Sequence, residues 1–332
     1  MLTVRPSIGV SCCSNTSTRT RSLWSSRFSL KTTTMCMSMS ITSSSSSSSS
    51  SSPTKTNTIV PAIIIGDDRV AGILQSMGDG NDLMIMPGEA IPTYPPGPIF
   101  VCCTVPGAKK VIKAIPLSRL KDLVFFQIGM IGTSLTIEDP GQVLFMGKSG
   151  KPDDQTTDIN PDEFNAAYGK WASAIATRFE SQGRPCKVLE KEAFQKQLLE
   201  SLIFICAFTL VGLLNQCATV GAVEKEYRSE VAKLISELAS AAAAEKGIVF
   251  EQGMEERVFA YSRVYPDMSI RSRYFEWRHG WFYFISKKAV AKGKPDPCPL
   301  HTEWLEKQFR KLKRLKMPEN CTFYNYDSFQ RK

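Results

Sequence analysis

The chain has 332 residues, of which 42% are apolar and 22% are charged, so it lies in the ordinary globular range and is long enough for two domains. Its net charge of +9 is concentrated near the N-terminus, because residues 1–66 contain six basic residues and no acidic one. The remainder carries 35 positive and 32 negative charges, and this balance of +3 argues against nucleic acid as a partner.

The segment before Pro53 has the composition of an organelle transit peptide. It combines scattered Arg with abundant Ser and Thr, and it ends in a serine run from Ser43 to Ser52. We therefore expect residues 1–53 to be a disordered transit peptide. Serine dominates and arginine is sparse, which favours the plastid stroma over the mitochondrion. A low-complexity tail that is not cleaved is the alternative.

Cysteine and histidine usage indicates neither a disulfide framework nor a metal site. Three of the ten cysteines lie in the leader, and the others form no C-x-x-C pair. The two histidines, His279 and His301, leave little material for histidine-based metal sites or for Ser-His and Cys-His catalysis. Cys298 and His301 have metal-like spacing, but no second ligand pair accompanies them, and we expect no metal.

The first part of the mature chain alternates short apolar runs with helical patterns. The run Ile63–Ile65 predicts a strand, and Asp68–Met77 has apolar residues at helical spacing, as has Pro106–Ile115. Five prolines between Pro87 and Pro98 predict that the usual third strand and its helix are shortened into an extended loop. Further strands are expected at Leu83–Met86, Ile99–Cys103, Leu123–Gln127 and Val143–Met146. Continuous apolar strands predict a shortened parallel sheet covered on both faces, an α/β domain over residues 54–150.

The second part, residues 151–332, is expected to be an all-α domain. The polar stretch Lys148–Ile159 marks the boundary, and Asn160–Glu163 has the composition of a helix start. The apolar run Leu202–Leu214 is shorter than the roughly 20 residues that span a bilayer, so it predicts a buried core helix and no membrane partner. Helices are expected at Phe164–Gln182, Lys191–Asn215, Val223–Lys246 and Thr302–Leu315.

Two features could suggest nucleic-acid binding, and both have a simpler explanation. The aromatic cluster Tyr274–Phe284 lies beside several arginines, but such clusters at helical spacing are more often core packing than base-stacking surfaces. The basic run Arg310–Lys316 is more often a solvated helix face. We therefore expect no nucleic-acid partner.

The strand, turn and helix at Ile63–Met77 are the main candidate for a ligand site, because a glycine-rich turn at a helix N-terminus can hold a pyrophosphate. Aligned on the pattern G-x-G-x-x-G, the chain keeps Gly66 and has the accepted variant Ala71 at the third position. The second glycine is replaced by Asp68, whose charge would face the phosphates unless Arg69 offsets it. With Val70, these residues predict a Rossmann-like cofactor turn that binds NADP or NAD weakly.

The expected second strand lacks an obvious reader of the cofactor ribose. Such cofactors use an acid for the 2′-hydroxyl of NAD or an arginine for the 2′-phosphate of NADP. Here the expected strand ends with Met84, Ile85 and Met86, followed by Pro87 and Gly88, and Glu89 is a poor substitute for the acid.

Six stretches together resemble the ketopantoate-reductase-like proteins of plants, which have a 6-phosphogluconate-dehydrogenase-like C-terminal domain. The resemblance covers almost all of the mature chain and implies a Rossmann-like domain followed by a helical one. It also includes Thr104 among the cofactor-binding residues. The stretches are Ile63–Ala71, Phe100–Thr104, Leu123–Met130, Lys187–Gln195, Ala218–Gly221 and Phe275–Tyr283.

The resemblance also implies which residues occupy the catalytic positions. Ketopantoate reductases use NADPH to reduce a 2-oxo acid, with a lysine as the main catalytic group, two asparagines and a late glutamate. The lysine position is occupied by Ser201, and the asparagine positions by Ile128 and Ile205. Glu276 matches the late glutamate, and Lys196 lies about one helical turn before Ser201.

Two functions follow from this pattern. The favoured one is a family member with weakened or lost NAD(P)-dependent activity that binds a metabolite or a protein partner, because losses occur at the turn, the ribose position and the catalytic positions. The alternative is an active NAD(P)H-dependent reductase of a small 2-oxo acid, with its catalytic cation moved to Lys196 or Arg278. The resemblance also allows a homodimer.

Overall fold

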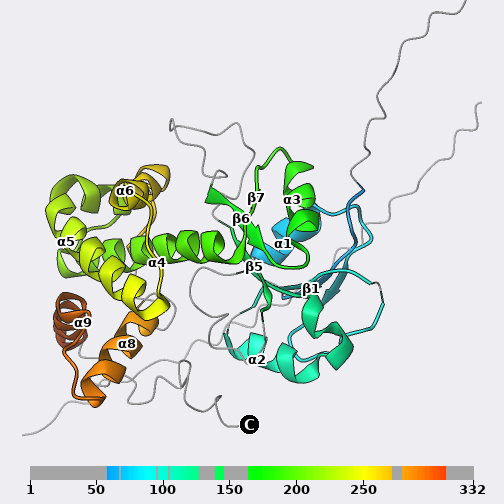
Figure 1. Cartoon of the computed structure of the whole chain (residues 1–332). Coiled ribbons are helices and arrows are strands. Elements are labelled where there is room, and N and C mark those ends of the chain that lie inside the picture. The colour runs from blue at the N-terminus through cyan, green and yellow to red at the C-terminus, as the bar shows by residue number, and fades with distance from the viewer. Residues whose placement is uncertain are drawn as a thin grey trace, which may run out of the picture. The chain divides into compact units, whose positions relative to one another are not determined.

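A seven-stranded sheet forms the first half of the structure, which is a computed structural model (Figure 1). It describes residues 58–66, 69–94, 96–103, 105–126, 139–145, 164–270 and 279–311. The strand order is β2-β1-β3-β4-β5-β6-β7, parallel throughout except where β5 and β6 pair antiparallel. The strands are β1 (Ile63–Ile65), β2 (Leu83–Ile85), β3 (Ile99–Val101), β4 (Leu123–Phe126), β5 (Gly141–Leu144), β6 (Ala166–Tyr168) and β7 (Lys187–Val188).

Helices cover both faces of this sheet, as the continuous apolar strands predicted. Successive side chains of a strand point to opposite faces, so Ile64 packs with α1 (Arg69–Ser76) and α3 (Ala172–Glu180). Ile63 and Ile65 pack on the other face with α2 (Val105–Ala114). A 3₁₀ helix, η1 (Leu117–Asp122), leads from α2 to β4.

The strand order confirms a Rossmann-like fold with one unit shortened. The full dinucleotide-binding order is 3-2-1-4-5-6, and removing its third strand leaves the order seen from β2 to β5. No strand or helix occurs in the described residues between Pro87 and Pro98, where the prolines predicted an extended loop. Arg119 of η1 holds this loop by donating to the carbonyl oxygens of Thr93 (2.8 Å) and Gly97 (2.9 Å).

The single helix expected from Phe164 to Gln182 is wrong. Residues Ala166–Tyr168 instead form β6, which pairs with β5, and the helix α3 begins only at Ala172. Gly169 makes the turn between them with a φ of 101°, a conformation that favours glycine. Pairing with the sheet therefore overrode a pattern that looked helical, and the sheet continues past residue 150 to Val188.

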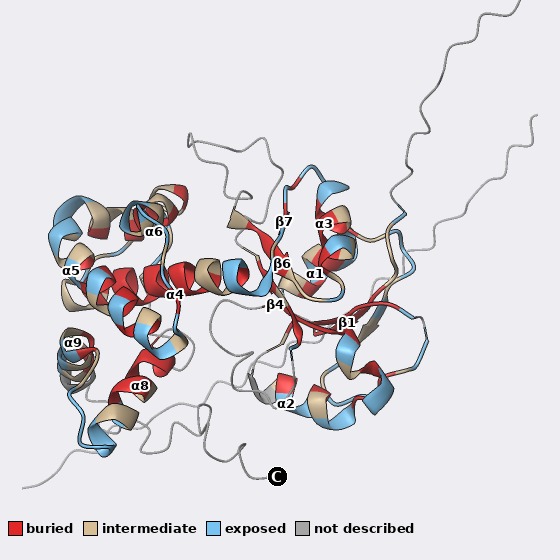
Figure 2. Ribbon diagram, in the orientation of Figure 1, coloured by how far each residue is buried: buried red, intermediate tan, exposed pale blue. Residues whose placement is uncertain are grey.

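The second half is helical, and its core surrounds α4 (Lys191–Leu214). Figure 2 shows α4 buried along most of its length, as expected for the run Leu202–Leu214. Within the described residues, α4 alone is long and apolar enough to cross a membrane by length and composition, and 78% of its most apolar window is buried in the protein. The helices packed around it are α5 (Val220–Lys246), α6 (Met254–Val264), α8 (Gly280–Ala291) and α9 (Pro299–Lys311).

Local signals account for the ends of α5. The Thr219 side chain caps its N-terminus by accepting a hydrogen bond from the Ala222 N–H at 3.3 Å. Gly247 ends it in the left-handed conformation with a φ of 64°. The expected start signal Asn160–Glu163 and the part of the basic run from Leu312 onward lie outside the described residues. Trp281 and Phe282 of the aromatic cluster are buried in the helical core.

Candidate functional site

Gly66, which directly follows β1, has a backbone conformation that favours glycine. Gly66 has a φ of 139°, and a Cβ at this position would lie 2.3 Å from the carbonyl oxygen of Cys102, after β3. No other amino acid fits there without a shift of the backbone, which explains why glycine occupies this position. Ala71 is fully buried against the sheet, Val70 is half-buried, and Arg69 is exposed at the start of α1. Asp68 and Thr104 lie outside the described residues.

An acid does stand at the end of β2, where the sequence alone showed no convincing ribose reader. The chain turns after this strand, with the Glu89 N–H donating to the Met86 carbonyl at 3.1 Å. The turn brings a Glu89 carboxylate oxygen within 2.9 Å of the Met86 N–H, and Glu89 itself is exposed. The sequence alone did not place Glu89 at the strand end, because it lies four residues beyond β2. Only the turn returns its carboxylate to the strand end.

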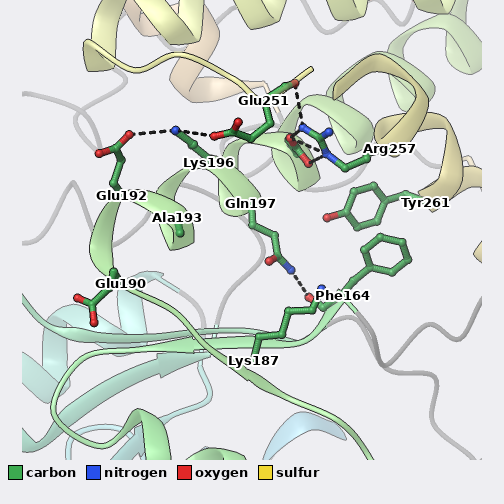
Figure 3. Close-up of a pocket in the computed structure, with 11 residues that line it drawn as sticks. Phe164, Lys187, Glu190, Glu192, Ala193, Lys196, Gln197, Glu251, Arg257 and Tyr261 are labelled. Carbon is green, nitrogen blue, oxygen red and sulfur yellow. Dashed lines mark hydrogen bonds and ion pairs between the residues drawn. The ribbon is translucent and has the colours of Figure 1, made fainter. Parts of the chain in front are cut away.

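A second feature is a pocket of about 440 Å³ bordered by β7, α4 and α6 (Figure 3). Its lining combines both signs of charge with two aromatic rings. Phe164 and Tyr261 are in contact, with ring centroids 4.3 Å apart and ring planes tilted by 34°. Figure 3 shows the Tyr261 hydroxyl pointing toward α4. Gln197 donates to the Phe164 carbonyl at 2.7 Å. The charged residues of the lining are Lys187, Glu190, Glu192, Lys196, Glu200, Glu251 and Arg257.

Lys196 lines this pocket, but its ammonium group already forms ion pairs with two carboxylates. Its Nζ lies 3.0 Å from Glu192 Oε1 and 3.0 Å from Glu251 Oε1. These hydrogen bonds raise the pKa of Lys196, so the side chain stays protonated at neutral pH. It can therefore donate a hydrogen bond to a ligand oxygen, but it cannot act as a general base there.

Arg257 and Glu200 form a second pair in the same wall. Arg257 Nη2 lies 2.5 Å from Glu200 Oε1, and its Nε contacts both carboxylate oxygens at 3.1–3.2 Å. The Arg257 guanidinium also donates to the carbonyl oxygens of Glu251 and Gln252. Glu200 is buried, so this pair holds α6 against α4 and leaves little of the guanidinium for a ligand.

Ser201, which the sequence resemblance aligns with a catalytic lysine, does not line the pocket. It is fully buried, and its hydroxyl donates to the Leu198 carbonyl of its own helix at 2.8 Å. Ile205 is also buried. Glu276, Ile128 and Arg278 lie outside the described residues. The structure thus brings Lys196 to the pocket and leaves Ser201 inside the helical packing.

The structure also brings together three residues that lie far apart along the chain. Cys206 of α4, His279 before α8 and His301 of α9 form a buried cluster. Spacing along the chain could not reveal it, because Cys206 is 73 residues from the nearer histidine. The one signal in the sequence was that the chain has only two histidines.

The structure is similar to those of several solved reductases. The 2-dehydropantoate 2-reductase of Methylococcus capsulatus aligns with a TM-score of 0.52 and 13% identity, over 78% of this chain and 99% of its own. The probable 2-dehydropantoate 2-reductase of Bacillus subtilis aligns with a TM-score of 0.52 and 14% identity, over 77% and 100%. D-mandelate dehydrogenase, solved with NADH and anilino(oxo)acetate, aligns with a TM-score of 0.51 and 12% identity, over 76% and 99%.

What these proteins share with this chain is the fold. Each of the three is matched along nearly its whole length, which supports the Rossmann-like and helical halves expected from the sequence. No protein-family model matches the sequence, and no curated protein sequence is significantly similar to it.

Proposed function

We propose that this protein binds a nicotinamide nucleotide at the turn after β1 and a small polar metabolite in the pocket of α4 and α6, with weak or no reductase activity. The first part rests on Gly66 and on the acid at the end of β2. Both suit the adenosine half of NAD. A carboxylate at the end of β2 can accept hydrogen bonds from the ribose hydroxyls of NAD, and it repels the 2′-phosphate of NADP. We therefore propose NAD in preference to NADP.

The observation that carries the loss of activity is the pairing of two of the three pocket cations with carboxylates. A bound nicotinamide nucleotide supplies the hydride for carbonyl reduction, and the protein must then neutralise the oxyanion that develops. Lys196 and Arg257 are already paired with carboxylates, and Ser201 offers neither a charge nor access to the pocket. With four carboxylates and three cations in the lining, a purely anionic 2-oxo acid is a poor match. A metabolite that carries an amino group as well suits the lining better.

The test is a titration of the purified protein with NADH and NADPH, followed by nucleotide fluorescence, and by turnover with a series of 2-oxo acids. We expect NADH to bind about tenfold or more tightly than NADPH, since one unfavourable charge contact costs on the order of 1 kcal/mol. Glu89→Ala should bring the ratio of the NADH and NADPH affinities closer to one. Glu180, an exposed acid at the end of α3, is the control, because Glu180→Ala should leave this ratio unchanged. Rapid turnover by the natural protein would overturn the proposed loss of activity.

Restoring the family cation supplies a second readout of the same proposal. Ser201→Lys should raise any residual turnover of 2-oxo acids by ~10² if a cation is all that is absent. Ser240→Lys is the matched control, because Ser240 makes the same kind of bond to its own helix but lies on the exposed face of α5. Since Ser201 is buried, its variant has to be checked for folding by circular dichroism. The titration of the natural protein decides the proposal in either case.

A further inference from the structure

Both histidines of the chain meet in one buried cluster with Cys206, although they lie 22 residues apart. Each of the three residues brings one ligand atom to within 4.8 Å of the other two. The exposed fractions of Cys206 and His301 are 0%, and that of His279 is 5%. None of the three lines the pocket of α4 and α6.

Hydrogen bonding indicates which ring nitrogens of the histidines carry lone pairs. The Thr209 hydroxyl donates to the Ile205 carbonyl at 2.5 Å, so at 3.4 Å from His279 Nε2 it can only accept. His279 therefore carries its proton on Nε2 and directs the lone pair of Nδ1 toward His301 Nε2, 3.2 Å away.

His301 is left with a buried nitrogen that has no hydrogen-bond partner in the described structure. If His301 Nε2 donates to His279, then His301 Nδ1 holds a bare lone pair, and Nδ1 has no partner. An imidazole can bind a metal ion through either ring nitrogen, so His301 can instead carry its proton on Nδ1 and turn the lone pair of Nε2 toward an ion beside His279.

The spacing within the cluster suits direct coordination as well as a hydrogen bond. In a tetrahedral site with Zn–N bonds of about 2.0–2.1 Å, two nitrogen ligands lie about 3.3 Å apart. The distance between His279 Nδ1 and His301 Nε2 is 3.2 Å. With an ion between these nitrogens, the His279 Nε2–H still donates to Thr209, which is the kind of outer contact that orients a ligating histidine.

Carboxylates next to His301 balance the charge that an ion would bring. A divalent ion with one thiolate and two neutral imidazoles leaves one net positive charge in the protein interior. The Glu237 carboxylate accepts hydrogen bonds from the backbone N–H groups of Leu300 and His301, each at 2.8 Å, and so fixes the first turn of α9. Asp296 accepts the N–H of Cys298 at 2.8 Å, just before that turn.

We propose that Cys206, His279 and His301 bind a borderline-soft transition-metal ion such as Zn²⁺. A thiolate with two imidazoles is a ligand set that selects such ions over Mg²⁺ and Ca²⁺. The site joins three segments of the helical half, namely the middle of α4, the start of α8 and the first turn of α9. Its role is therefore to stabilise the packing of these helices. This inference does not depend on the proposed cofactor or pocket.

The experiment measures the metal content of the full-length protein, purified under reducing conditions, and the absorption spectrum of its Co²⁺-loaded form. We expect about one zinc ion per chain by mass spectrometry of the metal. After removal of zinc with a chelator, Co²⁺ should produce visible d–d bands and a thiolate charge-transfer band in the near ultraviolet. Cys206→Ser should remove the charge-transfer band, and His301→Gln should reduce metal retention. Cys186, a buried cysteine in the sheet core, is the control, because Cys186→Ser should change neither the charge-transfer band nor the retention of metal.

The natural protein keeps the proposal falsifiable even where a variant fails to fold. If the natural protein retains no transition metal and gives no cobalt spectrum, the cluster is a hydrogen-bonded histidine pair and the proposal is wrong. Retention of metal that is unchanged in Cys206→Ser and His301→Gln overturns it as well, because the ion would then be bound elsewhere.

Discussion

At the scale of single residues, the close approach of backbone atoms explains why a glycine is needed directly after β1. Gly66 N donates to the Ile85 carbonyl of β2, and the Cys102 N–H after β3 donates to Ile65. These bonds bring three strand ends together around a residue with no side chain. The glycine therefore shapes the turn whether or not a nucleotide binds to it.

We predict that Gly66→Ala lowers the free energy of unfolding by about 1–3 kcal/mol, because it forces both a strained φ and a 2.3 Å contact with the Cys102 carbonyl. Gly72→Ala is the matched control, since a Cβ there meets nothing within 4 Å. In the interior of α1 it should stabilise the protein by about 0.5–1 kcal/mol. Urea denaturation of both variants checks the pair, and equal stabilities would contradict the prediction.

At the scale of elements, a buried ion pair fastens α3 to the sheet. Arg178 is 1% exposed and contacts both carboxylate oxygens of Asp82, at 2.6 and 2.7 Å. It also donates to the carbonyl oxygens of Leu74 and Val60. Asp82 in turn accepts the Ala62 N–H just before β1. One side chain thus connects α3 with α1 and with the segments that lead into β1 and β2.

We predict that Arg178→Ala lowers the free energy of unfolding by about 3–5 kcal/mol, because it leaves the Asp82 carboxylate buried without its partner. Lys191→Ala is the comparison, since Lys191 and Asp139 are also 2.6 Å apart but are 58% and 47% exposed. Removing that exposed pair should cost less than about 1 kcal/mol. Chemical denaturation gives both values, and a small loss for Arg178→Ala would show that Asp82 finds water or another partner.

At the scale of the whole molecule, the two halves share packing through α4. Its N-terminal residues Phe194 and Leu198 belong to the same core cluster as Leu144 of β5 and Ala166 of β6. The same helix then runs into the centre of the helical half, as Figure 2 shows. It therefore brings one wall of the candidate pocket, including Lys196, next to the segment that leaves β7.

The composition of residues 1–66 leads to a prediction about the location of the protein in the cell. Since residues 1–66 are rich in serine and contain no acid, a fluorescent protein fused behind them should accumulate in plastids. A matched fusion in which Arg19, Arg21 and Arg27 are changed to Glu should remain outside, because transit peptides are poor in acids. Microscopy of plant cells checks both fusions, and retention of the first in the cytosol would contradict the plastid proposal.

The sequence by itself determined the elements whose signals are local. The β-branched run before Gly66, the prolines between Pro87 and Pro98 and the apolar run within α4 each specify one short-range preference, and the structure agrees with all three. Lys196 was identified as a candidate from the resemblance, which places the catalytic lysine at Ser201, together with helical spacing, which puts Lys196 about one turn before it.

Only the tertiary structure decided the features that depend on long-range pairing. It turned Ala166–Tyr168 into a strand, returned Glu89 to the end of β2, and brought Cys206 to the two histidines. It also placed the Glu251 carboxylate, 55 residues along the chain, beside the Lys196 ammonium group. The physical reason is common to all four: each depends on groups that are distant along the chain or oriented by a turn, and local propensity contains no information about their separation in space.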